Sequence, residues 1–269
     1  MESFSQSQPF QSTRNIALWA TLSLGFVALL DCVSIVANAA EWVLASQYPE
    51  TIEASLTGEN ADFTDMPGGW MQAAVGLIGL GLGGFYVLGY LFAVVMFLIW
   101  MRRSYLNLMS LGVRQMDYST GWALGCWFVP LLNLVRPYEI IKEIWLKSDP
   151  DDVETTNSPL VSALELVQIA TPLFGLWWGF WIISNIFGNI STRLTFGAET
   201  LNEQMVSFSL AIISSLLSIV AAILAIGVVR GITARQEERN RRMLAVNQMT
   251  PHTYNTPPVP PIYGPPDLS

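Results

Sequence analysis

Few residues of this chain carry side chains suited to catalysis or metal binding, and several of the polar candidates lie inside apolar segments. The single histidine, His252, lies in the proline-rich C-terminal segment, so a histidine-based triad or a multi-histidine metal site is not expected. The two cysteines, Cys32 and Cys126, lie in apolar segments without metal-binding spacing, which is typical of small buried side chains. We therefore expect no enzyme activity, no catalytic residues, no metal and no cofactor.

Asp31 is the polar residue of greatest functional interest, because it is the only charged residue in its apolar segment. A carboxyl group within a membrane helix is costly, faces the protein interior or a cavity, and commonly marks a functional site. The alternative is a structural role, in hydrogen bonds to Ser34, Asn38 or Asn185, and the sequence leaves both open. Asn185 and Asn189 are four residues apart on one helix face, where they can bond to a neighbouring helix.

The run GLGLGG, residues 79–84, matches the glycine pattern of dinucleotide-binding loops. That chemistry requires a preceding strand, a following helix and water-accessible phosphates, whereas this run lies inside an apolar segment, so nucleotide binding is not expected. The pairs Gly79 and Gly83, and Gly175 and Gly179, instead form small-residue faces that let helices approach closely in lipid. We expect these faces to pack within the chain rather than against a second copy.

The elements that position these residues follow from composition. Hydrophobic residues make up 52% of the 269 residues and charged residues only 13%, against about 25% charged in an ordinary soluble domain. The apolar residues occur in long blocks, and a helix needs about 20 of them to cross a hydrocarbon layer of roughly 30 Å. The sequence therefore predicts an all-α polytopic membrane protein.

Four transmembrane helices are predicted, together with a re-entrant or interfacial helical motif over residues 104–147. The spans cover about residues 16–40, 70–101, 160–187 and 205–229. Residues 1–15 are assigned to a disordered N-terminus, residues 16–230 to the transmembrane domain, and residues 231–269 to a basic and then proline-rich disordered cytoplasmic tail.

The distribution of Lys and Arg decides between four and five spans, because cytoplasmic loops collect these residues. If residues 121–135 do not cross, 12 of the 13 Lys and Arg residues share one side with both termini, and only Arg193 lies opposite. If they do cross, only five of the 13 remain on the side of the N-terminus. We therefore predict a multi-pass protein of the cell inner membrane with both termini in the cytoplasm.

The stretch GWALGCWFVPLLNLVRPYEIIKEIW, residues 121–145, begins as an apolar segment and ends as an amphipathic helix. We interpret it as re-entrant or surface-lying, preceded by a short interfacial helix over residues 104–118. Its aromatic rings suit the headgroup level, and Arg136 and Lys142 can hold a lipid phosphate or another anion. The alternative is a structural plug at the end of the bundle. The candidate functional residues of this motif are Trp122, Trp127, Pro130, Asn133, Arg136, Pro137, Tyr138 and Trp145.

Residues 105–145 resemble the signature of a bacterial membrane family known as domain of unknown function 4328. The resemblance is carried by an N-x-x-x-L-G helix end (Asn107, Leu111, Gly112), by the dense Trp and Pro motif at 121–138, and by Trp145. A second shared block resembles WWGFWIISNIFGNIS, residues 177–191, and the whole similarity covers about residues 70–230. It implies a bacterial inner-membrane protein with no assigned activity.

Two classes of function follow from these features. The first is a non-enzymatic membrane scaffold or sensor whose partners are the lipid bilayer and anionic lipid headgroups; it can form a homo-oligomer and is not expected to bind nucleic acid. In this interpretation the basic cluster after the last span, residues 230–242, anchors the chain to headgroups. The alternative is a small transporter or channel with Asp31 in the pathway.

Overall fold

The computed structural model describes residues 9–57, 69–151 and 159–249, and the regular elements in these ranges are helices. Predictions made for residues 1–8, for the segments 58–68 and 152–158 and for the proline-rich residues 250–269 fall outside the described part of the chain. The long helices are α1 (Arg14–Gln47), α3 (Gly69–Ser110), α6 (Pro159–Gly197) and α7 (Leu201–Met249), and the short elements are α2 (Pro49–Thr57), α4 (Thr120–Gly125), the 3-10 turns η2 (Cys126–Phe128) and η3 (Leu132–Leu134), and α5 (Arg136–Lys147).

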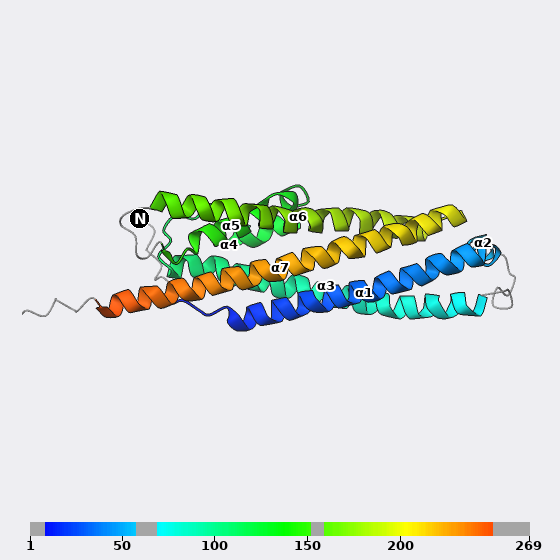
Figure 1. The fold of residues 1–269 in the computed structure, drawn as a ribbon, viewed down its shortest axis with the longest axis horizontal. Coiled ribbons are helices and arrows are strands. Elements are labelled where there is room, and N and C mark those ends of the chain that lie inside the picture. Colours follow the sequence, from blue (N-terminus) through cyan, green and yellow to red (C-terminus); the bar gives the residue numbers. More distant parts are fainter. Residues whose placement is uncertain (1–8, 58–68, 152–158, 250–269) are drawn as a thin grey trace, which may run out of the picture.

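Within the described residues, four helices are long and apolar enough to cross a membrane, namely α1, α3, α7 and the part of α6 from Pro172. Figure 1 shows that successive long helices run in opposite directions, so α1 and α6 begin toward the end of the bundle at which α3 and α7 finish. The helices α4 and α5 lie toward that same end, which we call the hairpin end, and α2 lies at the opposite end (Figure 1). The predicted all-α fold with four candidate transmembrane helices is confirmed.

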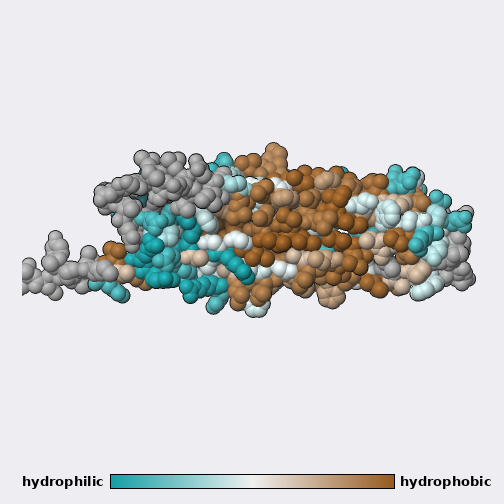
Figure 2. Space-filling view, viewed as in Figure 1, coloured by the Kyte–Doolittle hydropathy of each residue, from teal (hydrophilic) through white to brown (hydrophobic). Residues whose placement is uncertain are grey.

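The outside of the bundle is apolar in its middle and more polar toward both ends (Figure 2). In the most apolar stretch of α3 only 11% of the residues are buried, and large side chains such as Leu80 and Phe85 point outward. An apolar surface of this extent is unfavourable in water, but it loses nothing in hydrocarbon, because lipid tails are as apolar as leucine. The exposed belt is the physical reason to treat these helices as membrane spans.

The third helix ends later than the sequence analysis expected. Arg102 and Arg103 were interpreted as the end of the span, with a separate interfacial helix after them, but α3 continues without a break to Ser110. Gly112 follows the end of the helix, and its φ of 84° is the left-handed conformation that glycine adopts most readily. The amide of Val113 donates to the carbonyl oxygen of Leu108 at 3.0 Å, which completes a Schellman-type cap. The expected separate helix over 104–118 is therefore wrong.

The last helix also extends beyond its predicted end. Residues from 231 were assigned to a disordered tail, whereas α7 continues to Met249. The reason is that its polar residues are bound by the rest of the protein. Gln236 donates to the carbonyl oxygen of Ser104 at 2.8 Å, and Arg239 donates to that of Leu111 at 3.2 Å. These contacts are between residues more than 120 apart in the chain, so local composition does not reveal them.

The buried core is concentrated toward the hairpin end. Ile140, Ile141 and Ile144 form one apolar face of α5 and are almost fully buried. Burial of an isoleucine side chain is worth about 1.5–3 kcal/mol, so this face fixes α5 firmly on the bundle. Trp100 of α3 lies in the same core, and its Nε1 donates to the hydroxyl of Thr233 at 3.0 Å. The core therefore holds the segment after α3 against α3, α6 and α7.

The small-residue faces do not pack as expected. A Cβ added at Gly79, Gly83, Gly175 or Gly179 would meet no described atom within 4 Å, so the expectation of packing within the chain is wrong for these four residues. Other glycines make the close approaches instead. A Cβ at Gly89 would lie 3.0 Å from the ring of Phe26 in α1, and one at Gly231 would lie 2.7 Å from the ring of Trp145.

Candidate functional site: a hairpin above an aromatic cavity

Residues 113–147 leave α3, fold into the bundle and return to the hairpin end as a helical hairpin. Ser119 begins α4, and its hydroxyl accepts a hydrogen bond from the amide of Trp122 at 3.4 Å. Pro130 separates the two 3-10 turns, where a missing backbone N–H prevents a continuous helix. Pro137 lies in the first turn of α5, a position that needs no N–H donor. The two prolines therefore divide the hairpin into its descending and returning arms.

The tip of this hairpin presents apolar side chains outward. Phe128 and Leu131 are 77% and 79% exposed, and Trp122 and Val135 are more than half exposed. Pro130 is also exposed. A cluster of exposed apolar side chains is unfavourable in water and loses nothing in hydrocarbon. The side chain of Trp122 is exposed and faces away from the core.

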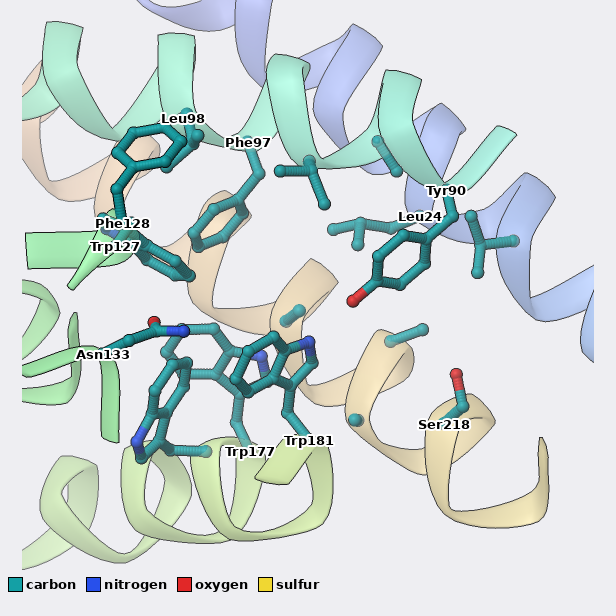
Figure 3. Close-up of a pocket in the computed structure, with 17 residues that line it drawn as sticks. Leu24, Tyr90, Phe97, Leu98, Trp127, Phe128, Asn133, Trp177, Trp181 and Ser218 are labelled. Atoms are coloured by element: carbon teal, nitrogen blue, oxygen red, sulfur yellow. The ribbon is translucent and has the colours of Figure 1, made fainter. Parts of the chain in front are cut away.

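An aromatic cavity of about 220 Å³ lies between the hairpin and the bundle (Figure 3). Trp127 and Asn133 of the hairpin form one side of it, and the hydroxyl of Tyr90 points into it from α3 (Figure 3). The part of its wall contributed by α7 is built from small residues, including Ala221, Ala222, Ala225 and Ser218. Large rings on α3, α6 and the hairpin facing small residues on α7 leave the space open.

Tryptophan rings connect the hairpin to α6. The ring centroid of Trp127 lies 5.6 Å from that of Trp178 and 6.4 Å from that of Trp181, both edge-on, and Trp178 and Trp181 stack at 4.6 Å. Edge-to-face and stacked pairs are worth about 0.5–1.5 kcal/mol each beyond their burial. Trp178 also donates its indole N–H to the carbonyl oxygen of Leu134 at 2.7 Å. Trp127 therefore packs inside the protein and not at the headgroup level where it was expected.

Three polar side-chain atoms of the hairpin are buried without a hydrogen-bond partner among the described residues, namely Nε1 of Trp145 and two atoms of residues that line the cavity. Among the described residues, neither Nε1 of Trp127 nor Oδ1 of Asn133 has a hydrogen-bond partner. Leaving a buried donor or acceptor unpaired costs about 1–3 kcal/mol, so such atoms are uncommon in stable cores. Both residues line the cavity. The site thus combines an apolar volume with an acceptor, Asn133 Oδ1, that is available to a ligand carrying a donor.

Glu143 organises the hairpin end of the site, although the sequence analysis did not select it. Its side chain is buried, and its carboxylate accepts from the amide of Asp117 at 2.7 Å and from Nζ of Lys147 at 2.7 Å. The hydroxyl of Tyr105 lies 3.1 Å from its other oxygen. Partial burial alone would lower the pKa of Lys147, but Glu143 and Asp117 raise it above its ordinary value. This buried ion pair connects both arms of the hairpin to α3.

Arg136 forms its hydrogen bonds with other residues of the hairpin. Its guanidinium donates to the hydroxyl of Tyr118 at 2.7 Å and to the carboxylate of Glu139 at 2.9 Å, and it lies 5.1 Å from the Tyr118 ring centroid. The hydrogen bond that Arg136 donates to Tyr118, together with electrostatic attraction to Tyr118 and Glu139, raises the pKa of Arg136. Partial burial and the bond to Glu139 raise the pKa of Tyr118. The expected anion would have to compete with Glu139 for this arginine.

Trp145 connects the hairpin to α7 through a contact with Arg235. Its ring packs edge-on against Phe174 at 5.4 Å, and the guanidinium of Arg235 lies 4.5 Å from its centroid. Arg235 also pairs with Asp149 at 3.2 Å. Trp145 is therefore an internal contact, unlike the interfacial ring that was expected. Tyr138 is likewise half-buried and packs against the core.

Asp31 is 1% exposed and lies between α1, α3 and α7. The hydroxyl of Tyr86 donates to its Oδ1 at 3.0 Å, and Ser218 lies beside the carboxyl group. Ser34 and Asn38, two of the partners that the sequence suggested, hydrogen bond with each other instead. Ser218 also lines the aromatic cavity, so the carboxyl group lies next to the cavity wall. Tyr86 was missed because a single tyrosine in an apolar helix carries no spacing signal.

The side-chain amides of Asn185 and Asn189 both donate hydrogen bonds within α6. Each side-chain amide donates to a carbonyl oxygen one turn earlier in α6, at 2.7 and 2.8 Å. The contact with α7 is made by Ser191 and Ser207, whose hydroxyls donate to each other's carbonyl oxygens at 2.9 and 3.0 Å. A further bond joins the hydroxyl of Ser214 to the carbonyl oxygen of Ser184 at 2.9 Å. Serines at a helix interface were the signal that the sequence analysis did not use.

Comparison with known proteins identifies the chain at the level of family. Residues 70–234 match the model of a family described as Domain of unknown function (DUF4328). This chain belongs to that family. No curated protein and no solved structure matches it. The resemblance inferred from residues 105–145 is confirmed.

The DUF4328 match contains α3, the hairpin, α6 and most of α7, and it leaves out α1. Besides the close approach of Phe26 to Gly89, the contacts that join α1 and its preceding residues to the matched region include two hydrogen-bonded ones. The side-chain amide of Asn107, a signature residue, makes two hydrogen bonds with the backbone of Gln11. Its Nδ2 donates to the carbonyl oxygen of Gln11 at 2.9 Å, and its Oδ1 accepts from the backbone N–H of Gln11 at 3.3 Å. The second contact is the bond between Tyr86 and Asp31. The hairpin and the cavity rings on α3 and α6 are thus DUF4328 features, whereas Asp31 lies outside the match.

Proposed function

We propose that this DUF4328 protein is a non-enzymatic membrane sensor that binds a small, largely apolar molecule in the aromatic cavity. The observation that carries the proposal is the position of Trp127 and Asn133, which line the cavity and contribute two unpaired buried polar atoms to the hairpin. Ligand sites are commonly apolar cavities with a few polar groups that orient the ligand. A ligand with one hydroxyl or N–H group would satisfy Asn133 Oδ1.

The contacts of the hairpin support a sensing role. The side of the hairpin that lines the cavity continues into α5, and α5 contacts α7 through Trp145 and Arg235. A ligand that changes the position of Trp127 would therefore change the packing between the hairpin and α7. A ligand shifts such an equilibrium only by its difference in affinity for the two arrangements. The sensing output is then a change at the hairpin end, where scaffold partners would bind.

The charge distribution supports the orientation proposed for this sensor. All 13 Lys and Arg residues are in the described ranges, and only Arg193 lies in the short α6–α7 region, away from the hairpin end. By the positive-inside rule, the hairpin end and both termini are cytoplasmic in an inner membrane. Labelling of single cysteines introduced at exposed positions 114 and 193 in intact cells tests this orientation. Labelling of position 114 from outside would contradict it.

A cavity-filling variant tests ligand binding without touching the hairpin. We expect Ala222→Leu, which places a larger side chain in the cavity wall, to abolish binding, and Ala211→Leu, a half-buried α7 residue outside the cavity lining, to preserve it. The probe is 1-naphthol, compared with 1-methoxynaphthalene, which has no donor for Asn133. Binding is measured by quenching of tryptophan fluorescence in lipid nanodiscs. Equal quenching in both variants, or equal affinity for both probes, would contradict the proposal.

Transport is a second candidate because of the position of Asp31. Among the described residues no Lys or Arg pairs with this buried carboxyl group, and its Oδ2 has no hydrogen-bond partner. Its neighbour Ser218 lines the cavity, so a solute in the cavity would lie close to the carboxyl group. This role predicts that Asp31→Asn abolishes an uptake or leak activity in proteoliposomes. A silent Asp31→Asn combined with loss of probe binding in Ala222→Leu would leave the sensor as the better account.

A further inference from the structure

A second concave site lies between α1 and α7 and shares no residue with the aromatic cavity. It is a groove of about 570 Å³, formed on both helices where apolar sequence meets charged sequence. The residues that matter for its chemistry are Arg14 and Leu18 of α1 and Arg230, Glu237 and Arg241 of α7. Three arginines on two helices thus face one groove next to exposed apolar side chains.

The arginines Arg14 and Arg241 are only partly engaged. Nε of Arg14 lies 3.5 Å from Glu237, and a terminal nitrogen of Arg241 lies 2.9 Å from Glu238. Each guanidinium carries five N–H donors, so most of its donors are still available. The two side chains are 66% and 70% exposed, and the carboxylates hold them in place at the edge of the groove.

Arg230 has no such partner. It is exposed, and no described residue forms a hydrogen bond or an ion pair with it. With Glu237 and Glu238 also in the lining, the groove retains one excess positive charge. The first turn of α1 contains no acidic residue, so the positive end of the helix dipole is not neutralised there and adds to this charge.

We propose that this groove binds a phosphate group, with Arg230 as its principal contact and with Arg14 and Arg241 as the other arginines of its lining. The planar guanidinium matches two phosphate oxygens at once, which a lysine cannot do. The phosphate can belong to an anionic lipid headgroup or to a soluble phosphate compound. In the first case Leu18 contacts the lipid chains. The site joins α1, which the family match leaves out, to α7, which the match contains in large part.

The test compares two exposed arginines at the same end of the bundle. Arg230→Gln removes the principal contact, and Arg102→Gln is the matched control, because Arg102 is exposed near the end of the apolar part of α3 and does not line the groove. Full-chain protein in neutral detergent is titrated with phosphatidylglycerol, phosphatidylcholine or sodium phosphate. Native mass spectrometry counts bound lipid, and thermal unfolding reports stabilisation by inorganic phosphate. Circular dichroism in detergent alone confirms that both variants are folded.

We expect Arg230→Gln to weaken phosphatidylglycerol binding by about tenfold or more, as when one charge-assisted hydrogen bond is lost, with Arg102→Gln unchanged. Phosphatidylcholine should bind more weakly than phosphatidylglycerol to the wild-type protein. Loss of stabilisation by sodium phosphate alone would support the same site with a soluble ligand. Equal losses in both variants would indicate non-specific attraction to headgroups and would overturn the proposal, as would wild-type behaviour of Arg230→Gln in every arm. Neither outcome depends on the aromatic cavity, so neither one contradicts the sensor proposal.

Discussion

The contact between Gly231 and Trp145 makes a sharp prediction about how the hairpin is held on α7. In Gly231→Ala, the added Cβ would lie 2.7 Å from Cζ3 and 3.3 Å from Cη2 of the Trp145 ring. Carbon atoms normally approach to about 3.5–4.0 Å, so the nearest pair overlaps by nearly 1 Å. The ring cannot swing aside freely, because Arg235 and Phe174 pack against it.

Two effects of opposite sign decide the magnitude. Overpacking of a rigid core contact costs about 1–3 kcal/mol. Replacing glycine by alanine inside a helix contributes about 1 kcal/mol in the other direction. Gly227 supplies the control, because it lies one turn earlier in α7 and a Cβ there meets nothing within 4 Å. We expect Gly227→Ala to be neutral or stabilising and Gly231→Ala to be less stable than it by about 1–3 kcal/mol, the overpacking term alone.

The assay is thermal unfolding of both variants in the same detergent. Unfolding is monitored by the fraction of protein that stays monodisperse in size-exclusion chromatography after heating. A second pair of variants places each alanine in a Trp145→Leu background, where the ring is absent. The penalty at Gly231 should disappear there, because the clash is with the ring. Equal stability of Gly231→Ala and Gly227→Ala in the wild-type background, or a penalty that persists without Trp145, would refute the reasoning.

Three further predictions concern the contacts that hold the long helices together. Arg239→Gln should destabilise the protein by about 1–3 kcal/mol, because it leaves buried carbonyl groups unpaired, and should increase proteolysis near the end of α7. Ser207→Ala should cost about 1 kcal/mol in the same unfolding assay, because it breaks the reciprocal bonds with Ser191. Ser209→Ala is the control and should not show this loss, because the Ser209 hydroxyl donates to Met205 within α7. Stability should also depend on alkaline pH. The pKa of Lys147 is raised in the fold, so its contribution is fully present below its ordinary pKa of 10.5 and is lost as the pH rises through the higher folded value. Glu143→Gln should flatten that loss in a pH titration of unfolding.

The sequence was sufficient for the class of fold, the number of long helices and the family. These depend on composition and on apolar blocks, and a block of about 20 apolar residues has few stable alternatives to a membrane helix. The prolines of the hairpin account for its break and for the start of α5, because their backbone constraints are local. Helix ends were less predictable. Arg102 and Arg103 resembled a stop signal, but α3 ends where Gly112 supplies the left-handed conformation.

Only the tertiary structure decided which polar and aromatic residues lie together. Trp127 and Trp145 are of the residue type common at membrane interfaces. They are partly buried because Trp127 packs against Trp178 of α6 and Trp145 packs against Arg235 of α7. The partner of Asp31 is Tyr86, 55 positions away in the chain, and the buried Glu143 is paired from both arms of the hairpin. Local residue patterns determine a helix and its apolar faces, whereas the choice of partner depends on how the faces of separate helices meet.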